Sequence, residues 1–151
     1  MQVSEILQSK GGRVVAIEPG AKVRDVASTL RQEGIGAALV RDRDGALLGI
    51  VSERDIVRGI AEEGSASLNK CAVDLMSRSV VTCQPESSTE ELMELMLAKQ
   101  IRHLPVYEDD ELVGIVSIGD VVKGVLSELK WREKILQQQV VTAVGWSTDE
   151  D

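Results

Sequence analysis

Two stretches of the chain carry the same order of apolar and polar positions. Residues 14–19 (VVAIEP) match residues 80–85 (VVTCQP), and residues 49–55 (GIVSERD) match residues 114–120 (GIVSIGD). The first pair is offset by 66 residues and the second by 65, so one residue is lost in the acidic turn between them. An internal repeat at this spacing predicts two copies of one structural unit.

Each copy is predicted to have the order β-α-β-β-α. Short β-branched runs at residues 14–17 and 80–83 are closed by a proline, as strands often are. Apolar residues then recur at i, i+3, i+4 and i+7, the spacing of a helix that buries one face. Two more strands follow, at residues 37–40 and 47–52 in the first copy, and a last helix begins near Asp55. The expected fold class is therefore α/β, of the α+β-like kind, with two repeats packed as a pseudo-twofold pair.

The segments outside the repeats set the expected boundaries. A short apolar helix at residues 3–8 enters the first repeat, and the small polar residues 63–67 (EGSAS) are typical of a linker. Near the end, a helix with one apolar face is predicted by a seam that steps by three or four: Val125, Leu129, Arg132, Leu136 and Val140. An acidic tail follows, which we expect to be frayed. We place the three units at residues 1–66, 67–124 and 125–151.

Composition narrows the classes of function. The 151 residues are 43% hydrophobic and 28% charged, which is enough apolar material for a packed core. Aromatic residues make up 2% and the net charge is −8, so nucleic acids and anionic membranes are not expected partners. An anionic ligand would need a local pocket. Because no apolar run reaches about 18 residues and no signal peptide is recognisable, we expect a cytoplasmic protein that spans no membrane.

The reactive side chains argue against an enzyme. His103 is the only histidine, and neither Cys71 nor Cys83 has a context that lowers a thiol pKa. A nucleophile elbow and a glycine-rich phosphate loop are both absent from the sequence. The two cysteines also lack the spacing of a zinc site. We therefore expect no catalysis, no metal and no catalytic cofactor.

The signature Gly-hydrophobic-x-Ser-x-x-Asp, at residues 49–55 and 114–120, together with residues 101–106 (IRHLPV), resembles the cystathionine-β-synthase (CBS) domain family. Over nearly its whole length the chain is similar to a stand-alone pair of CBS domains, also called a Bateman module. The resemblance implies a regulatory module that senses an adenine nucleotide (AMP, ADP, ATP or NAD) or S-adenosylmethionine in two clefts between the repeats. It also implies a homodimer with a protein target that the sequence does not identify.

The signature has two interpretations at the level of its residues. Ser52 and Asp55 are spaced as a helix cap, which occurs at most helices. A carboxylate there can also accept two hydrogen bonds from ribose hydroxyls, beside a helix start that suits phosphate. The resemblance favours the ribose and pairs each aspartate with the other repeat. One expected site consists of Ile50, Ser52, Arg54, Asp55, Thr82, Cys83, Ile101, Arg102 and His103. The other consists of Ile17, Glu18, Ile35, Gly36, Ile115, Ser117 and Asp120.

Other interpretations stay open for several of these residues. Arg102 and His103 can hold a phosphate together, or form a surface cation pair. The first repeat has Gly36 and Ala37 at the matching places, so the two sites should differ. Cys83 can also pack as a small apolar residue. A different class of function is a constitutive interaction scaffold, whose C-terminal helix binds a partner and whose ligand clefts are vestigial.

Overall fold

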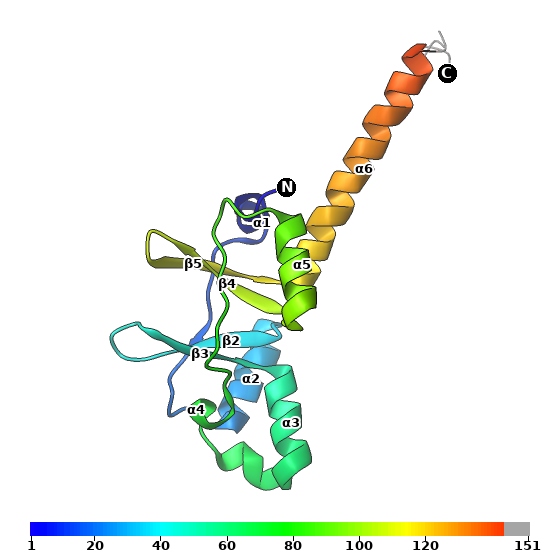
Figure 1. The fold of residues 1–151 in the computed structure, drawn as a ribbon. Coiled ribbons are helices and arrows are strands. Elements are labelled where there is room, and N and C mark those ends of the chain that lie inside the picture. The colour runs from blue at the N-terminus through cyan, green and yellow to red at the C-terminus, as the bar shows by residue number, and fades with distance from the viewer. Residues whose placement is uncertain (144–151) are drawn as a thin grey trace.

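The computed structural model describes residues 1–143, which form two similar units stacked on each other and a long helix that leaves the body (Figure 1). The first unit contains β1 (Ala16–Ile17), α2 (Val23–Glu33), β2 (Ala37–Arg41), β3 (Leu47–Ser52) and α3 (Glu53–Glu63). The second contains α5 (Thr89–Lys99), β4 (His103–Glu108), β5 (Glu111–Ser117) and α6 (Ile118–Ala143). Three further segments are α1 (Val3–Lys10), the 3-10 helix η1 (Gly64–Asn69) and α4 (Ala72–Leu75). The α/β class and the repeated order of elements are confirmed.

The two sheets are small, and their antiparallel strand pairs have the same register. β1 runs parallel to β2, β2 pairs antiparallel with β3, and β4 pairs antiparallel with β5. Val40 lies opposite Gly49 and Val106 lies opposite Gly114, and an irregularity follows both pairs. The lost residue falls in the following turn, where residues 42–46 separate the pair Arg41 and Leu47, and residues 108–111, one fewer, separate the equivalent pair Tyr107 and Leu112.

The first strand of each repeat is shorter than the sequence predicts. Only Ala16 and Ile17 form β1, and in the second unit Cys83 makes an isolated parallel bridge to Val106. The backbone N–H of Val80 donates to the carbonyl of Arg78, 3.1 Å away, so the chain turns there instead of joining β4. The prediction of a strand over residues 80–83 is therefore wrong.

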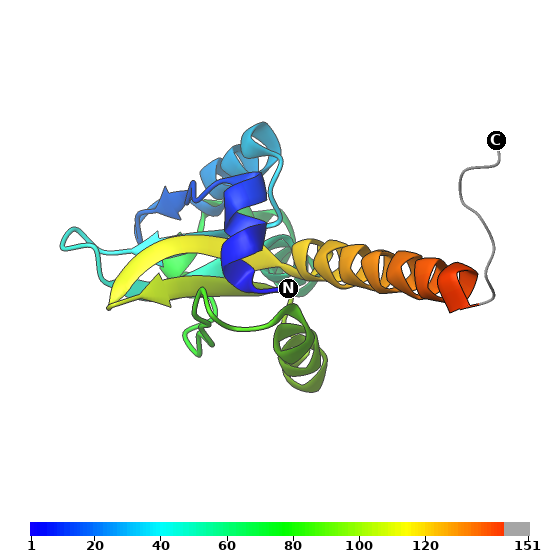
Figure 2. The same cartoon turned by 90° about the horizontal axis from the view of Figure 1, so that it is seen from above.

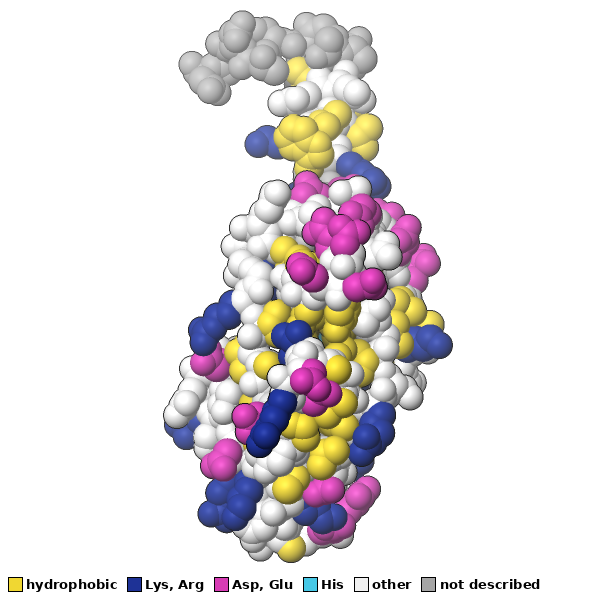
Figure 3. Space-filling model, turned by 90° about the vertical axis from the view of Figure 1, so that its left-hand side faces the viewer, with side chains coloured by type: hydrophobic (Ala, Val, Ile, Leu, Met, Phe, Trp, Pro, Cys, Tyr) yellow, Lys and Arg dark blue, Asp and Glu magenta, His cyan; other side chains and the backbone are white. Residues whose placement is uncertain are grey.

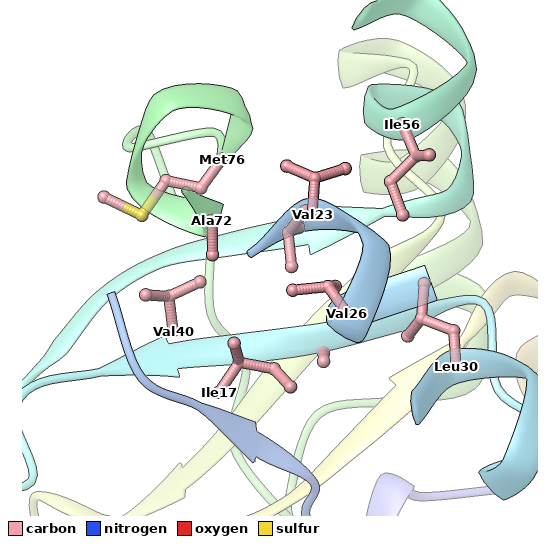
Figure 4. Packing of buried hydrophobic residues seen from close by; sticks show 10 residues of the cluster. Ile17, Val23, Val26, Leu30, Val40, Ile56, Ala72 and Met76 are labelled. Carbon is pink, nitrogen blue, oxygen red and sulfur yellow. The ribbon is translucent and has the colours of Figure 1, made fainter. Parts of the chain in front are cut away.

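The structure has two separate hydrophobic cores, and each contains a short helix that directly precedes the other unit in the sequence. The core of the first unit includes Ala72 and Met76 from α4 and the residue that follows it (Figure 4). The core of the second unit includes Val3 and Ile6 from α1, although α1 precedes the first unit in sequence. Each short helix thus packs on the unit that it does not directly precede, which ties the two units together.

The segment expected to be a linker is ordered and packed. α3 ends at Glu63, and residues 64–69 continue as η1 in place of a flexible connection. Ser67 is fully buried, and a Cβ atom at Gly59 would lie 2.7 Å from its Oγ atom. The small residues that suggest a linker instead allow close packing of η1 against α3.

α6 confirms the predicted C-terminal helix. Its first half packs against α5 and α1, and Glu128 accepts a hydrogen bond of 2.8 Å from the N-terminal ammonium of Met1. Its second half projects from the body (Figures 1 and 2), where Leu129, Leu136 and Val140 are 53%, 59% and 59% exposed. Figure 3 shows hydrophobic side chains on this projecting part. The predicted acidic tail lies outside the described residues, and none of the described helices is long and apolar enough to cross a membrane.

Candidate functional site

A cleft of about 350 Å³ opens between the two units. One wall is the junction of β3 with α3, and the other is formed by the chain before α5 and by the entry into β4. The residues of this cleft that the sequence predicts as site residues are Gly36, Ile50, Ser52, Arg54, Asp55, Ile101, Arg102 and His103. The structure therefore brings Asp55 of one unit together with Arg102 and His103 of the other.

Asp55 caps α3 with one of its two carboxylate oxygens. α3 begins at Glu53, earlier than predicted, so that Asp55 is its third residue. The Oδ2 atom accepts hydrogen bonds from Ser52 N at 2.8 Å and Ser52 Oγ at 3.0 Å. The Oδ1 atom has a looser ion pair with Arg58 at 3.6 Å. The cap interpretation is correct for Oδ2, while Oδ1 keeps capacity for a further donor.

Basic side chains outnumber acidic ones along the cleft. Arg54, Arg58, Lys99 and Arg102 line it, against Glu53 and Asp55. The chain as a whole has a net charge of −8, so an anionic ligand needs a pocket where positive charge is locally concentrated. This cleft provides such a pocket.

Sequence reasoning missed eight residues of the cleft. These are Glu53, Arg58, Ser77, Ser79, Val80, Val81, Lys99 and Gln100. Arg58 follows Arg54 by one helical turn, so the spacing within α3 could have indicated it. The residues before α5 carry no such signal, because their place in the cleft depends on the path of the chain between the two units.

His103 lies half-buried at the boundary between the units. A Cβ atom at Gly36 would lie 3.3 Å from its Nε2 atom. Burial lowers the pKa of His103 below 6.5, the nearby charges of Lys10 and Arg102 lower it further, and Asp120 and Glu53 oppose this. The imidazole is therefore neutral near neutral pH.

Three predicted residues lie elsewhere than expected. Val80 and Val81 line the cleft in place of Thr82 and Cys83. The backbone N–H of Cys83 donates to the Pro105 carbonyl, and its carbonyl accepts from the N–H of Tyr107. Its side chain therefore lies in the second core, where burial raises the pKa of the thiol to about 11. Thr82 lines a separate groove near the hairpin turn of residues 109–110. Gly36, expected beside Asp120, lines the cleft of Asp55 instead.

Asp120, the equivalent of Asp55 in the second unit, is bound by a lysine from α1. Asp120 Oδ2 accepts a hydrogen bond from Ser117 N at 2.9 Å and another from Lys10 Nζ at 2.6 Å. Lys10 Nζ also donates to the Ile115 carbonyl, 3.0 Å away. Burial acts to raise the pKa of Asp120, but the bonds from Lys10 and Ser117 outweigh it, so the pKa lies below its ordinary value.

The sequence also predicts Ile17, Glu18 and Ile35 for that second site. Ile17 belongs to the core of the first unit, and Ile35 packs against the same core. Glu18 is exposed. Lys10 itself carries no signal in the sequence, because the contact joins residues 110 positions apart.

A family model of the CBS domain matches this chain twice, at residues 3–62 and 72–127. The chain belongs to the CBS domain family. A CBS-domain-containing protein from Agrobacterium tumefaciens is 45% identical, with a TM-score of 0.80 over 82% of this chain and 92% of that protein. A CBS domain protein from Pyrobaculum aerophilum complexed with AMP is 31% identical, with a TM-score of 0.70 over 80% of this chain and 89% of that one.

A plant relative is longer than this chain. The CBS domain-containing mitochondrial protein from Arabidopsis thaliana is 34% identical over 134 residues, which cover 83% of this chain and 65% of the plant protein. The chain thus spans less than two thirds of that relative. The two matched segments establish a tandem pair of CBS domains, and the cleft of Asp55 lies between the first CBS domain and the second.

Proposed function

We propose that this CBS pair is a non-catalytic regulatory module that binds an adenine nucleotide in the cleft between Asp55 and Arg102. The observation that carries the proposal is the cleft itself, where a carboxylate at a helix start meets an arginine and a histidine from the other domain. The AMP complex of the Pyrobaculum relative supports the adenine nucleotide as the ligand class.

Each group in the cleft has a role in this proposal. The Oδ1 atom of Asp55 accepts hydrogen bonds from the ribose hydroxyls, while Oδ2 keeps the cap of α3. Arg102 and Arg54 donate charge-assisted hydrogen bonds to phosphate oxygens, and the neutral His103 adds one more donor. The apolar side chains of Ile50 and Ile101 provide a surface for the adenine ring.

The charge of the cleft favours a ligand that carries phosphate. Four basic side chains against two acidic ones attract AMP, ADP, ATP or the diphosphate of NAD. S-adenosylmethionine carries a positive sulfonium group and no phosphate, so the same charges disfavour it. We therefore rank the adenine nucleotides above S-adenosylmethionine.

Regulation follows from the position of the cleft between two domains. A ligand that contacts Asp55 on one side and Arg102 on the other stabilises one arrangement of the domains and shifts the population toward it. We propose that a protein target reads this shift, and that the module works as a homodimer. The cytoplasmic location stays a prediction from the sequence, and the Arabidopsis relative is named as mitochondrial.

Titration calorimetry with AMP, ADP, ATP, NAD, S-adenosylmethionine and adenosine tests the proposal. We expect the wild-type chain to bind AMP. Asp55→Ala should lower the affinity for AMP by about tenfold or more, because a ribose hydrogen bond to a charged group is lost. Asp74→Ala is the matched control, since Asp74 caps α4 through Cys71 N at 3.0 Å and does not line the cleft. An equal effect of both variants on AMP affinity, or no AMP binding to the wild type, would refute the proposal.

A second candidate function is a constitutive scaffold with vestigial clefts. The observation that favours it is the apolar face on the projecting half of α6, where Leu129, Leu136 and Val140 are more than half exposed. The same calorimetric titration separates the two candidates, because a scaffold gives no binding heat with any member of the nucleotide panel.

A further inference from the structure

We propose that Lys10 closes the second nucleotide position of this CBS pair, so that the chain binds one nucleotide tightly instead of two. This inference rests on the function proposed above. It concerns Asp120, which matches Asp55 in the repeat and bonds to Ser117 as Asp55 bonds to Ser52. A pair built from equal repeats would offer two equivalent ribose acceptors, one at each aspartate.

The ammonium of Lys10 binds the carboxylate of Asp120 at the second position, on the same oxygen that caps α6. Lys10 Nζ donates to Asp120 Oδ2 at 2.6 Å and to the Ile115 carbonyl at 3.0 Å. Ile115 and Asp120 are the repeat counterparts of Ile50 and Asp55, and both of those line the first cleft. In the first domain the Ile50 carbonyl accepts a hydrogen bond from Ser77 N at 2.8 Å, so Lys10 takes the place of that backbone donor. Its positive charge lies on the carboxylate whose other oxygen, Oδ1, is the counterpart of the proposed ribose acceptor.

The exchange of short helices places Lys10 there. α1 buries Val3 and Ile6 in the core of the second domain and lies beside β5 (Figure 2), so its last residue, Lys10, points at the start of α6. A Cβ atom at Gly49 would lie 2.7 Å from Met76 Sδ and one at Gly114 would lie 2.7 Å from Leu7 Cδ2, so the counterpart of Met76 is Leu7 and not Lys10. α1 continues past Leu7 to Lys10, whereas α4 ends at Leu75, so the first domain presents no equivalent ammonium to Asp55.

The contact is strong enough to compete with a ribose. A hydrogen bond between an ammonium and a carboxylate is about twice as strong as one between neutral groups. The side chains of Lys10 and Asp120 are only 35% and 20% exposed, which limits competition from water. A ribose that binds Asp120 must share its carboxylate with this ammonium, which we expect to cost about tenfold or more in affinity.

Titration calorimetry of the wild type, Lys10→Met and Lys70→Met with AMP and with adenosine tests the inference. Lys10→Met removes the ammonium and keeps an unbranched side chain of similar length. Lys70→Met is the matched control, because it also breaks a 2.6 Å ion pair, with Glu63, away from both aspartates. We expect a second AMP site in the wild type at least about tenfold weaker than the first. Lys10→Met should tighten that second site about tenfold for AMP and adenosine alike, and Lys70→Met should change neither site.

Several results would overturn the inference. Two sites of equal affinity in the wild type would do so without any variant. Binding constants of the second site that are unchanged in Lys10→Met would do so as well. If Lys10→Met lowers the affinity for AMP but not the affinity for adenosine, Lys10 is a phosphate ligand instead. If the wild type binds no AMP but Lys10→Met binds one, the proposed function of the first cleft fails while the role of Lys10 stands. Absence of AMP binding in both proteins would refute both.

Discussion

Gly36 and His103 face each other where the two CBS domains meet, and a Cβ atom on Gly36 would lie 3.3 Å from Nε2 of the imidazole. The first domain has Gly36 and Ala37 at the places where the second has Arg102 and His103. Small residues in one domain therefore make room for large ones from the other. This asymmetry concentrates the basic groups of both domains on the cleft of Asp55.

Filling the space at Gly36 should displace His103. We expect Gly36→Val to lower the affinity for AMP about tenfold, because the added side chain forces the imidazole of His103 out of its place in the cleft. Gly20→Val is the control, since a Cβ atom at Gly20 would meet no atom within 4 Å. Calorimetry of the double variant Gly36→Val/His103→Ala decides the mechanism. If the glycine acts through the histidine, the double variant binds AMP no more weakly than His103→Ala alone.

Arg102 should discriminate ligands by their phosphate charge. We expect Arg102→Ala to lower the affinity for AMP by about tenfold or more and to leave the affinity for adenosine almost unchanged, because only AMP loses a charge-assisted hydrogen bond. Arg24→Ala removes an equal charge at an arginine that donates to Asn69 and does not line the cleft. Binding constants for both ligands measure the effect. Equal losses for adenosine and AMP would assign Arg102 to the structure of β4 instead.

The buried imidazole of His103 should make the fold sensitive to mild acid. Burial holds the pKa of His103 below 6.5, so the unfolded chain takes up a proton before the folded chain does. Stability should therefore be full near pH 7 and should fall as the pH drops through 6.5 toward the folded pKa. We expect His103→Gln to lose less stability than the wild type between about pH 7 and about pH 5, as urea unfolding would measure. An identical loss in both proteins would show that other groups titrate in this range.

The local order of elements was predictable because each element has a signal of its own. The apolar spacing of Val23, Val26 and Leu30 places one buried face on α2, and all three side chains are in the first core. The duplicated Ser-x-x-Asp also placed Asp55 at the start of α3. Periodicity and caps are properties of neighbouring residues, so a single sequence reveals them.

The parts of the site that were missed depend on long-range packing. Lys10 reaches Asp120 only because α1 packs on the second domain, and no local pattern encodes that exchange. Thr82 and Cys83 were expected in the cleft, but the turn at Val80 shifts the lining to Val80 and Val81. Because residues 80–82 belong to no strand, the path of the chain alone decides which of their side chains face the cleft.

The projecting half of α6 carries an apolar face that the described residues leave uncovered. Leu129, Leu136 and Val140 are each more than half exposed, and their spacing near 3.5 residues suits a second helix of the same kind. This part of α6 extends beyond the body (Figure 1), so the occupant we propose is α6 of a second copy of the chain.

Breaking this apolar face with a charge should dissociate the dimer and spare the nucleotide cleft. Leu136→Glu places a carboxylate in the interface from each copy, and the lost burial of two leucines should weaken dimerisation on the order of 100-fold. A substitution is preferable to deletion of the helix, because Glu128 binds the N-terminal ammonium and Gly124 is buried. Gln137→Glu adds the same charge about a quarter turn away and should leave the dimer intact. Sedimentation equilibrium measures the assembly, and calorimetry with AMP should give the same affinity for both variants. A dimer that Leu136→Glu leaves unchanged would mean that the CBS domains alone form the interface.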